Sequence, residues 1–292
     1  MFFTKIHGCG NDYIFLDCRQ DQPEQPGFLA RKLCHRKTGI GGDGLVLLLP
    51  SDCADCRMVI YNPDGSEAEM CGNAIRGICY LYNKLTGEEK DILNVETLSG
   101  VRECLIHRDF TPLQVTVDMG EPVINPRKIP VLSERGVVIN EEIQILGETF
   151  TMTCVSMGNP HAVVFVEDVS HIKLEEIGIP FEHNLRFPNR TNVEFVQVIS
   201  RERVRVRVWE RGTGETLACG TGACAVVAAG VLTGRLSRSV EVMLPGGNLH
   251  VDYDEVTNHI WMSGPTVMVF DGEIDLDHMP PEFRVLPENF GS

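Results

Sequence analysis

The chain has 292 residues, of which 43% are hydrophobic and 23% are charged, and this composition excludes a disordered chain, a collagen and a coiled coil. Asp and Glu number 41 against 26 Lys and Arg, so the formal charge is −15, which disfavours nucleic acid and anionic membranes as partners. The 11 cysteines are odd in number and irregular in spacing, which predicts reduced thiols in a cytosol-like compartment rather than a disulfide scaffold.

Neither a signal peptide nor a membrane span is expected. The first residues, MFFTKIHGCGND, do not contain a basic stretch followed by an apolar one. The longest apolar runs, residues 45–49 and 223–232, are shorter than the roughly 20 residues that a spanning helix needs. We therefore expect a cytoplasmic protein.

The first half of the chain mixes short strands with helices. Residues 13–16, 45–49 and 58–61 are apolar and strand-like, and residues 28–35 and 74–85 suit helices. Gly39-Ile-Gly-Gly-Asp-Gly44 matches a dinucleotide-binding GxGxxG pattern, but that pattern requires a strand before it and a helix after it. Here the order is reversed, so we reject a dinucleotide cofactor.

The second half repeats the first. Gly10-Asn11 recurs as Gly158-Asn159, 148 residues later, and each pair is followed by a strand-like run. At the same offset, Cys71-Gly72 recurs as Cys219-Gly220, before an apolar helix-like segment at 223–232. Residues 203–209 alternate as a half-buried strand does, and the last four of them, 206–209, fall on the strand-like run at 58–61.

This repeat predicts two equivalent α/β domains of common size. We assign residues 1–118 to the N-terminal half and residues 119–265 to the C-terminal half. Residues 266–292 are added to the N-terminal half, because the strand-like run at 266–270 is expected to return and pair with it. Residues 121–149 have no partner in the first half.

The two Cys-Gly pairs place a cysteine at the start of one central helix in each half. A helix N-terminus carries unpaired N–H groups and a partial positive charge, which lowers the pKa of a thiol and holds a carboxylate. Two thiols on opposite sides of one carbon can remove a proton and return one from behind, which inverts the stereocentre. The backbone N–H groups of Gly72, Asn73, Gly220 and Thr221 would stabilise the charge that develops on the carboxylate.

The motifs KIHGCGND from Lys5, NPDGSEAEMCGNAIR from Asn62, SMGNPHAVV from Ser156 and ERGTGETLACGTGA from Glu210 resemble the diaminopimelate epimerase family over nearly the whole chain. The resemblance implies an α/β (α+β) fold of two pseudo-symmetric domains, each with a curved mixed or antiparallel sheet around a central helix, and an active site in the interdomain cleft. It implies cofactor-independent interconversion of LL- and meso-diaminopimelate, in lysine and peptidoglycan precursor synthesis, and no metal.

The family's functional positions fall on residues of this chain. The catalytic cysteines would be Cys71 and Cys219, and their pKa would be tuned by His161 and Glu210. Substrate would be bound by Asn11, Asn62, Gly72, Asn73, Asn159, Asn192, Glu210, Arg211, Gly220 and Thr221. Many members carry Gln where this chain has Gly44, so that side-chain contact is missing. The partner would be the small amino acid substrate; the sequence does not set the oligomeric state, a homodimer among the options.

Other interpretations were weighed against this one. A racemase of another amino acid, such as histidine or proline, and a non-catalytic amino acid binding protein are the alternatives that stay open. A cysteine protease gives no reason for duplicate cysteines, and a pyridoxal enzyme needs a lysine that neither cysteine motif contains. Cys53-Ala-Asp-Cys56 resembles a redox or zinc CxxC, but we expect a surface loop, because no second pair completes four ligands.

Overall fold

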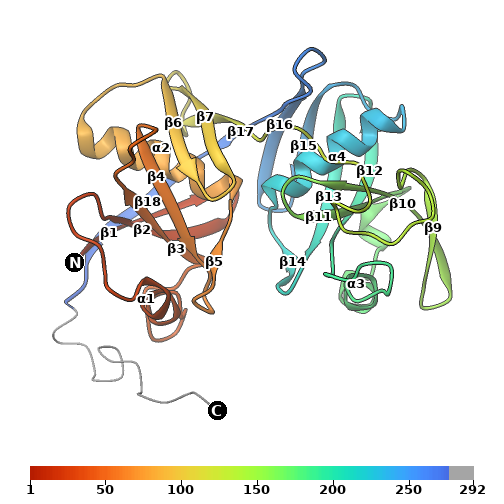
Figure 1. Cartoon of the computed structure of the whole chain (residues 1–292), viewed down its shortest axis with the longest axis horizontal. Helices are drawn as coiled ribbons and strands as arrows, with labels where there is room; N and C mark the ends of the chain where they lie inside the picture. Colours follow the sequence, from red (N-terminus) through yellow and green to blue (C-terminus); the bar gives the residue numbers. More distant parts are fainter. Residues whose placement is uncertain (276–292) are drawn as a thin grey trace. The chain divides into compact units, whose positions relative to one another are not determined.

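The structure is a computed structural model in which residues 1–275 are described, and these divide into two compact units. The first unit contains Met1–Val115 and the segment from Thr266, and the second contains Thr116–Pro265. In Figure 1 the first unit is red to yellow together with the blue strand β18 (Val267–Glu273), and the second unit runs from yellow-green to lighter blue. The final part of the assigned N-terminal half, residues 276–292, lies outside the described residues.

The first unit is a mixed sheet in the order β18–β1–β2–β3–β4–β6–β7. The pairs β2–β3 and β4–β6 are parallel, the other pairs are antiparallel, and β5 adds to the end of β4. The strands are β1 (Phe2–Gly8), β2 (Asn11–Asp17), β3 (Gly44–Leu49), β4 (Cys56–Tyr61), β5 (Glu67–Ala68), β6 (Ile92–Thr97), β7 (Gly100–His107) and β18 (Val267–Glu273), and the helices are α1 (Pro26–Leu33) and α2 (Gly72–Thr86).

Helix α2 is the central helix of this unit and contacts β1, β2, β3, β4 and β7. Its apolar side chains recur at helical spacing, and Ile75, Ile78 and Cys79 are completely buried. The helix ends at Gly87, whose φ of 69° is left-handed and favours glycine. The predicted helix at 74–85 is therefore confirmed, with its first residue at Gly72.

The second unit has the same topology, in the order β9–β10–β11–β12–β13–β15–β16–β17, with β8 paired to β17 and β14 to β13. The pairs β11–β12 and β13–β15 are parallel. The elements are β8 (Gln114–Asp118), β9 (Glu141–Ile145), β10 (Glu148–Ser156), β11 (Pro160–Val166), η1 (Val169–His171), α3 (Leu174–Glu182), β12 (Asn192–Ser200), β13 (Arg203–Glu210), β14 (Gly214–Thr216), α4 (Gly220–Leu232), β15 (Ser239–Leu244), β16 (Gly247–Tyr253) and β17 (Ile260–Pro265).

The repeat seen in the sequence is also a repeat of strand register. In the first unit Tyr13 of β2 pairs with Gly44 of β3, and in the second His161 of β11 pairs with Asn192 of β12. Both pairs are parallel, and their residues match at the offset of 148. Helix α4 occupies the place of α2, contacting β10, β11, β12, β16 and β17. Two pseudo-symmetric units, each with a sheet packed on a central helix, confirm the predicted fold class.

One expectation about the repeat is wrong. Part of the segment 121–149, which lacked a counterpart in the sequence, forms β9, the strand next to β10. The counterpart of β9 is β18, which pairs with β1 in the first unit. The sequence comparison missed the match because β9 comes directly before β10 in the chain, whereas β18 reaches β1 from the far end of the chain. The expected return of the strand-like run at 266–270 to the first half is observed in the β1–β18 pairing.

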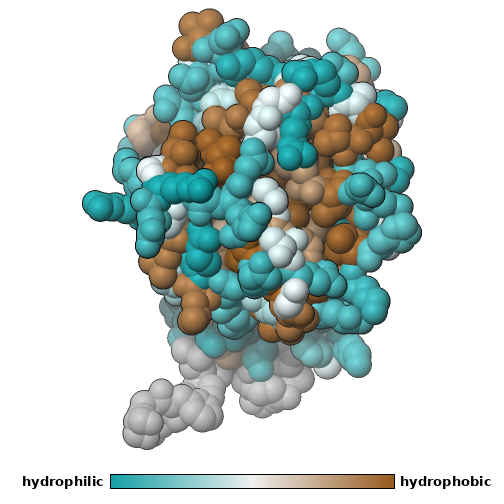
Figure 2. All heavy atoms as spheres, turned by 90° about the vertical axis from the view of Figure 1, so that its right-hand side faces the viewer, coloured by the Kyte–Doolittle hydropathy of each residue, from teal (hydrophilic) through white to brown (hydrophobic). Residues whose placement is uncertain are grey.

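None of the helices in residues 1–275 is long and apolar enough to cross a membrane. The face of the molecule in Figure 2 carries hydrophobic residues scattered among hydrophilic ones. The apolar side chains that matter for the fold are inside each unit. Examples are the completely buried Phe181 and Phe195 in the second unit and Ile14 and Leu47 in the first.

Candidate active site

In the first unit, four chain segments bring polar residues together where the ends of neighbouring strands meet. Strands β2 and β3 begin there, β4 ends there, and α2 begins there. The register pairs Tyr13 with Gly44 and Leu45 with Tyr61, so Asn11 and Asn62 lie at the same end of the sheet. The cysteine before α2 joins them, and we call this group the Cys71 cluster: Asn11, Tyr13, Asn62, Cys71 and Asn73.

Cys71 is the residue immediately before α2 and has an extended backbone, with φ of −141°. The first backbone hydrogen bond of the helix runs from the N–H of Ile75 to the carbonyl of Cys71. The N–H groups of Gly72 and Asn73 therefore have no acceptor within the helix and suit an anion. The Cys71 thiol lies 3.1 Å from the Tyr13 hydroxyl and 3.8 Å from Oδ1 of Asn11.

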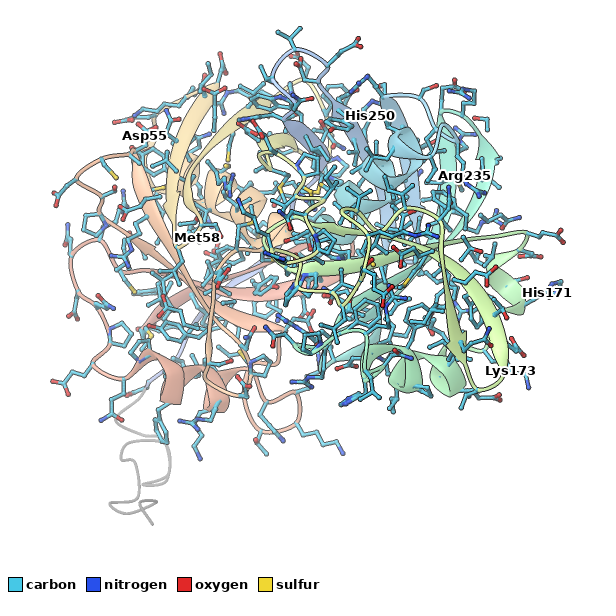
Figure 3. All side chains as sticks on the ribbon, turned by 45° about the vertical axis from the view of Figure 1, so that its right-hand side comes forward. Asp55, Met58, His171, Lys173, Arg235 and His250 are labelled. Carbon is cyan, nitrogen blue, oxygen red and sulfur yellow. The ribbon has the colours of Figure 1, made fainter. Side chains whose placement is uncertain are left out.

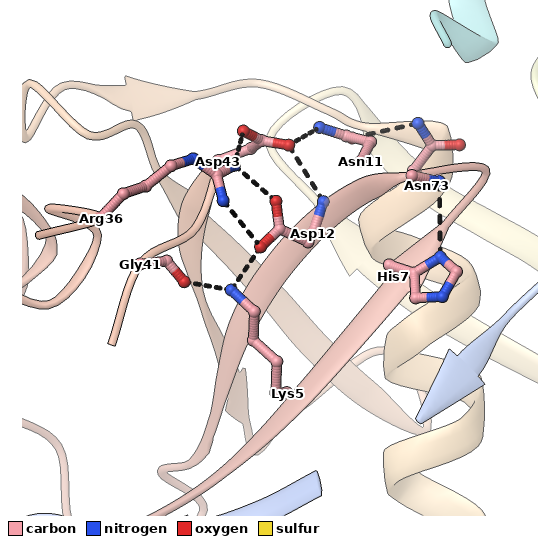
Figure 4. Close-up of polar contacts among 9 residues, drawn as sticks. Lys5, His7, Asn11, Asp12, Arg36, Gly41, Asp43 and Asn73 are labelled. Atoms are coloured by element: carbon pink, nitrogen blue, oxygen red, sulfur yellow. Dashed lines mark hydrogen bonds and ion pairs between the residues drawn. The ribbon is translucent and has the colours of Figure 1, made fainter. Parts of the chain in front are cut away.

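A chain of hydrogen bonds fixes the amides beside Cys71 (Figure 4). Nδ2 of Asn11 donates to Asp43 at 2.8 Å, so Oδ1 of Asn11 faces the other way, where it accepts from Nδ2 of Asn73 at 3.0 Å. Arg36 binds Asp43, and the buried Arg76 donates to Oδ1 of Asn73 at 2.7 Å. The orientation of both amides is thereby set by charged groups.

Asp12 connects this chain of hydrogen bonds to the buried lysine of β1. Its carboxylate is contacted by Lys5 at 2.6 Å and by Arg36 at 2.6 Å. Burial opposes ionisation of Asp12, but the hydrogen bonds from the two cations outweigh it and hold the pKa of this carboxyl at about 2. Asp12 is therefore ionised over the whole physiological pH range.

Asn62 directly follows β4, and the register of β4 with β3 brings it to the same end of the sheet as the other members of the Cys71 cluster. Its side chain Nδ2 donates to Oγ of Ser66 at 3.0 Å, within the turn between β4 and β5. Its amide oxygen is the group that suits a substrate ammonium.

In the second unit, the corresponding residues lie at the equivalent end of the sheet. We call them the Cys219 cluster: Asn159, His161, Asn192, Glu194, Glu210, Cys219 and Thr221. Cys219 is the residue before α4, and its sulfur accepts from the N–H of Gly222 at 3.4 Å and lies 3.4 Å from Oγ1 of Thr221. The first backbone bond of α4 runs from Ala223 to Cys219, so the N–H groups of Gly220 and Thr221 also have no acceptor within the helix.

The expected lowering of the thiol pKa is wrong for Cys219. Burial raises the pKa of this thiol well above its usual range, and the nearby carboxylates of Glu210 and Glu194 raise it further. Hydrogen bonds from Thr221 and Gly222 oppose these effects but are weaker. The sequence argument considered only the helix terminus, whereas here two acidic side chains and removal from water outweigh it.

Glu210 is the neighbour of Cys219 that the sequence singled out. Burial raises the pKa of this carboxyl, while the hydrogen bond from Thr216 and the proximity of His161 lower it. Glu210 is also within hydrogen-bonding reach of Cys219. The structure therefore brings both predicted tuning residues, His161 and Glu210, to the Cys219 side.

His161 is completely buried, and both of its ring nitrogens have partners. Nδ1 lies 2.6 Å from Oε1 of Glu194, and Nε2 lies 2.9 Å from Oδ1 of Asn159. Both contacts join a ring nitrogen to an oxygen atom of a neighbouring side chain. Among residues 1–275, the second oxygen of Glu194 is buried without a hydrogen-bond partner.

Asn192 and Arg211 are joined through the backbone. Nδ2 of Asn192 donates to the carbonyl of Pro160 at 2.8 Å, and its Oδ1 accepts from the N–H of Arg211 at 2.9 Å. The Arg211 side chain is exposed and donates to the carbonyl of Asn189 at 3.2 Å. Asn192 thus holds the turn that carries Arg211, and its amide keeps one donor and one acceptor position for a ligand.

Two other predictions concern the remaining cysteines and metal ions. Cys53 is exposed in a loop, whereas Cys56 is the first residue of β4 and is completely buried. Burial raises the pKa of Cys56 to about 12. Within residues 1–275, no group of three or more His, Cys, Asp or Glu side chains is arranged to hold a metal ion.

Comparisons with known proteins agree with the motifs. The family described as "Diaminopimelate epimerase" matches residues 3–125 and 153–269. A curated "Diaminopimelate epimerase" from Acetivibrio thermocellus is 50% identical over 96% of this chain and 100% of its own length. One from Methanococcus maripaludis is 51% identical over 94% of this chain and 100% of its own length.

The chain belongs to the diaminopimelate epimerase family. Members of this family are isomerases. A solved structure described as a hydroxyproline epimerase from Agrobacterium vitis aligns with a TM-score of 0.71 over 97% of this chain and 93% of that one, at 15% identity. At that identity the likeness shows the shared fold.

Three residues that support the two clusters were not predicted from the sequence. Nothing in the sequence singles out Glu194, although it faces His161 directly. Glu182 of α3 accepts from Nε1 of Trp209 at 2.8 Å and from the N–H of Gly212 at 2.9 Å, which supports the turn after Glu210. Tyr13 contacts Cys71, and the offset of 148 could have found it, because that offset places Tyr13 on His161.

The structure gives a reason for a glycine at position 44. A Cβ at this position would lie 2.8 Å from the carbonyl oxygen of Tyr61 and 2.9 Å from Cε1 of Tyr13. Real Cβ atoms do not approach that closely, so the ring of Tyr13 and a side chain at position 44 exclude each other.

Proposed function

We propose that this chain interconverts LL- and meso-diaminopimelate by moving a proton at one α-carbon, with Cys71 and Cys219 as the two acid–base groups. The observation that carries the proposal is the duplication itself. In each unit the ends of the equivalent strands meet at the same end of the sheet, and a cysteine comes directly before the equivalent central helix. A reaction whose substrate and product are mirror images at the reacting carbon needs such a pair of groups.

In the proposed step, a thiolate takes the α-proton from one face of the carbon, so the C–H bond breaks and an S–H bond forms. The electron pair is delocalised toward the carboxylate, where the N–H groups of Gly72, Asn73, Gly220 and Thr221 stabilise it. The second thiol then gives its proton to the opposite face and becomes the thiolate. Configuration at the carbon is inverted, and the negative charge has moved from one sulfur to the other.

The second amino acid end of the substrate does not react and must be held in place. Arg211 suits its carboxylate, because a guanidinium binds a carboxylate with two parallel hydrogen bonds. Asn62, Asn159, Asn192 and Glu210 offer oxygens that suit its ammonium. We assign Asn11, which is oriented by Asp43, to the reacting end because it lies beside Cys71.

The raised pKa of Cys219 bears on which sulfur gives the first proton. Because burial and two carboxylates keep this thiol protonated, Cys219 in the substrate-free protein suits the proton donor. For the reverse direction it must become a thiolate. The substrate's ammonium beside Glu210 would offset the carboxylate charge and make that ionisation easier.

The test is turnover of LL-diaminopimelate by the purified, reduced protein without added cofactor, followed by chiral chromatography. The proposal predicts the meso isomer, and it predicts no turnover for Cys71→Ala or Cys219→Ala. Full activity in either variant would refute the two-base mechanism. Histidine and proline serve as comparison substrates: racemisation of one of them, with diaminopimelate untouched, would instead support the racemase, and binding without any exchange the binding protein.

Three accompanying predictions have their own measurements. The epimerase halves are assigned as residues 1–118 with 266–292 and residues 119–265, which limited proteolysis tests. The homodimer stays a prediction that sedimentation velocity tests. The cytoplasmic location stays a prediction that cell fractionation tests.

A further inference from the structure

Tyr13 is the one ring side chain of the Cys71 cluster. It is buried on β2, its ring packs edge-on against Phe15 with centroids 6.4 Å apart, and its hydroxyl lies 3.1 Å from the Cys71 sulfur. The absence of a side chain at Gly44 leaves the space that the ring occupies. Packing on both sides therefore directs the hydroxyl at the sulfur.

The position of Tyr13 is matched in the other unit by a residue already assigned to thiol tuning. Tyr13 and His161 occupy the same register position, each paired with the first residue of the neighbouring parallel strand, Gly44 of β3 or Asn192 of β12. His161 is close enough to lower the pKa of Glu210, the carboxyl beside Cys219, whereas Tyr13 contacts its cysteine directly. The two units thus place different polar rings at one structural position.

The chemistry of the contact favours one charge state of the sulfur. A buried hydroxyl needs a hydrogen-bond partner, and a neutral thiol is a weak one. A thiolate is a strong acceptor, because hydrogen bonds to charged groups are about twice as strong as neutral ones. The contact is therefore worth most when Cys71 has lost its proton.

From this contact we propose that Tyr13 is a positioning residue that donates a hydrogen bond to the Cys71 thiolate and so stabilises Cys71 in its proton-accepting form. The inference rests on the proposed function, in which Cys71 removes the α-proton. No proton leaves Tyr13: its O–H bond stays intact while the sulfur gains and loses the substrate proton. Tyr13 would thus favour the thiolate form of Cys71, whereas Glu210 and Glu194 disfavour the thiolate form of Cys219.

Other charged and polar groups surround this sulfur and must stay constant in the test. From α2 come Asn73 and, behind it, the buried Arg76. Asp43 reaches the sulfur's neighbourhood through Asn11, and His7 of β1 accepts from the N–H of Gly10 in the adjoining turn. Tyr13→Phe removes one oxygen atom and alters none of these residues.

The experiment measures the alkylation rate of Cys71 by iodoacetamide across pH 5.5–9.5 in the reduced protein, resolved by peptide mass spectrometry (range chosen to bracket an ordinary thiol, about 8.5). Exposed Cys53 is the internal reference. In Tyr13→Phe the pH at which Cys71 becomes reactive should rise by about one unit, with about tenfold slower alkylation at neutral pH. Buried Tyr82 on α2 supplies the matched control, Tyr82→Phe, which should leave the profile unchanged.

Turnover gives the second readout. The acid limb of the kcat/KM profile should move upward by the same amount in Tyr13→Phe, and kcat/KM should fall about tenfold in both directions. An unshifted alkylation profile in the folded variant would overturn the inference, even if epimerisation is observed. Absent epimerisation with a shifted profile would overturn the proposed function and leave the contact established.

A second variant covers the case in which Tyr13→Phe does not fold, as judged by circular dichroism. Tyrosine ionisation is then followed by absorbance in wild type and Cys71→Ala, whose five tyrosines are the same. A thiolate beside Tyr13 delays loss of the phenol proton, so one tyrosine should ionise at lower pH in Cys71→Ala. Identical titrations would overturn the inference.

Discussion

Replacing Glu210 with Gln removes one of the two carboxylates that raise the pKa of Cys219. The side chain keeps its shape and its hydrogen bond with Thr216, but the negative charge beside the sulfur is lost. The substitution should therefore lower the pKa of Cys219 and make this thiol more reactive. It should also reduce turnover, because the proposed ammonium partner has lost its charge.

The size of the effect follows from the contact. Glu210 is within hydrogen-bonding reach of Cys219. Two unit charges about 4 Å apart interact by about 4 kcal/mol at an effective dielectric constant of about 20. One pH unit corresponds to about 1.4 kcal/mol, so the upper limit is a decrease of about three units. Because the hydrogen bond from Thr216 and the nearby His161 offset part of this charge, we expect a decrease of about one to two units (about half the limit).

The assay is alkylation of Cys219 as a function of pH, with exposed Cys53 as the internal reference. Glu215→Gln is the matched control, because Glu215 lies on neighbouring β14 and pairs with Arg207. Glu210→Gln should move the Cys219 profile to lower pH, and Glu215→Gln should not. An unchanged or upward-shifted Cys219 profile in Glu210→Gln would refute the reasoning that this carboxylate keeps the thiol protonated.

Three further predictions follow from other contacts. Asp43→Ala removes the acceptor that orients Asn11, so kcat/KM should fall about tenfold, and an unchanged kcat/KM would contradict that role. His161→Leu leaves the buried carboxylate of Glu194 without its partner and should reduce the free energy of unfolding by about 3 kcal/mol. His171 is exposed and points outward in Figure 3, so the control His171→Leu should change the free energy of unfolding little. Equal chemical-denaturation midpoints for the two variants would contradict this prediction. Burial raises the pKa of three thiols to about 12, those of Cys18, Cys34 and Cys56. In the unfolded chain these thiols lose their protons first, so the free energy of unfolding should fall by about 1.4 kcal/mol per pH unit for each thiol as pH rises from about 9 toward 12. A free energy of unfolding that stays constant over this range would refute the prediction.

The sequence predicted most of the fold because its strands and helices have strong local patterns. The alternating run at 203–209 became β13, and the apolar run at 223–232 became most of α4. The repeat predicted that the two halves are equivalent, and the order of the strands within each sheet came from the structure. The match between β9 and β18 could not be found, because it depends on a strand that reaches its unit from the other end of the chain.

For the candidate site, the sequence placed both cysteines before their helices but did not predict the chemistry around each. A helix terminus lowers a thiol pKa in isolation, and nothing local to Cys219 indicates that Glu194 would also approach it. Glu194 comes from β12, 25 residues earlier, and its approach depends on the sheet register. The contact of Tyr13 with Cys71 likewise depends on Gly44 leaving room on the next strand.

The central claim is that two separate thiols act on one carbon, and isotope incorporation at early times tests it most directly. LL-diaminopimelate containing only protium is incubated with the protein in heavy water, and the product and the remaining substrate are analysed separately by mass spectrometry at low conversion. Two thiols predict a product that carries one deuterium at its α-carbon and a remaining substrate that carries none, because the removed proton and the delivered deuterium reside on different sulfurs. Product that retains the original protium, or substrate that gains deuterium as fast as product forms, would contradict the two-thiol account.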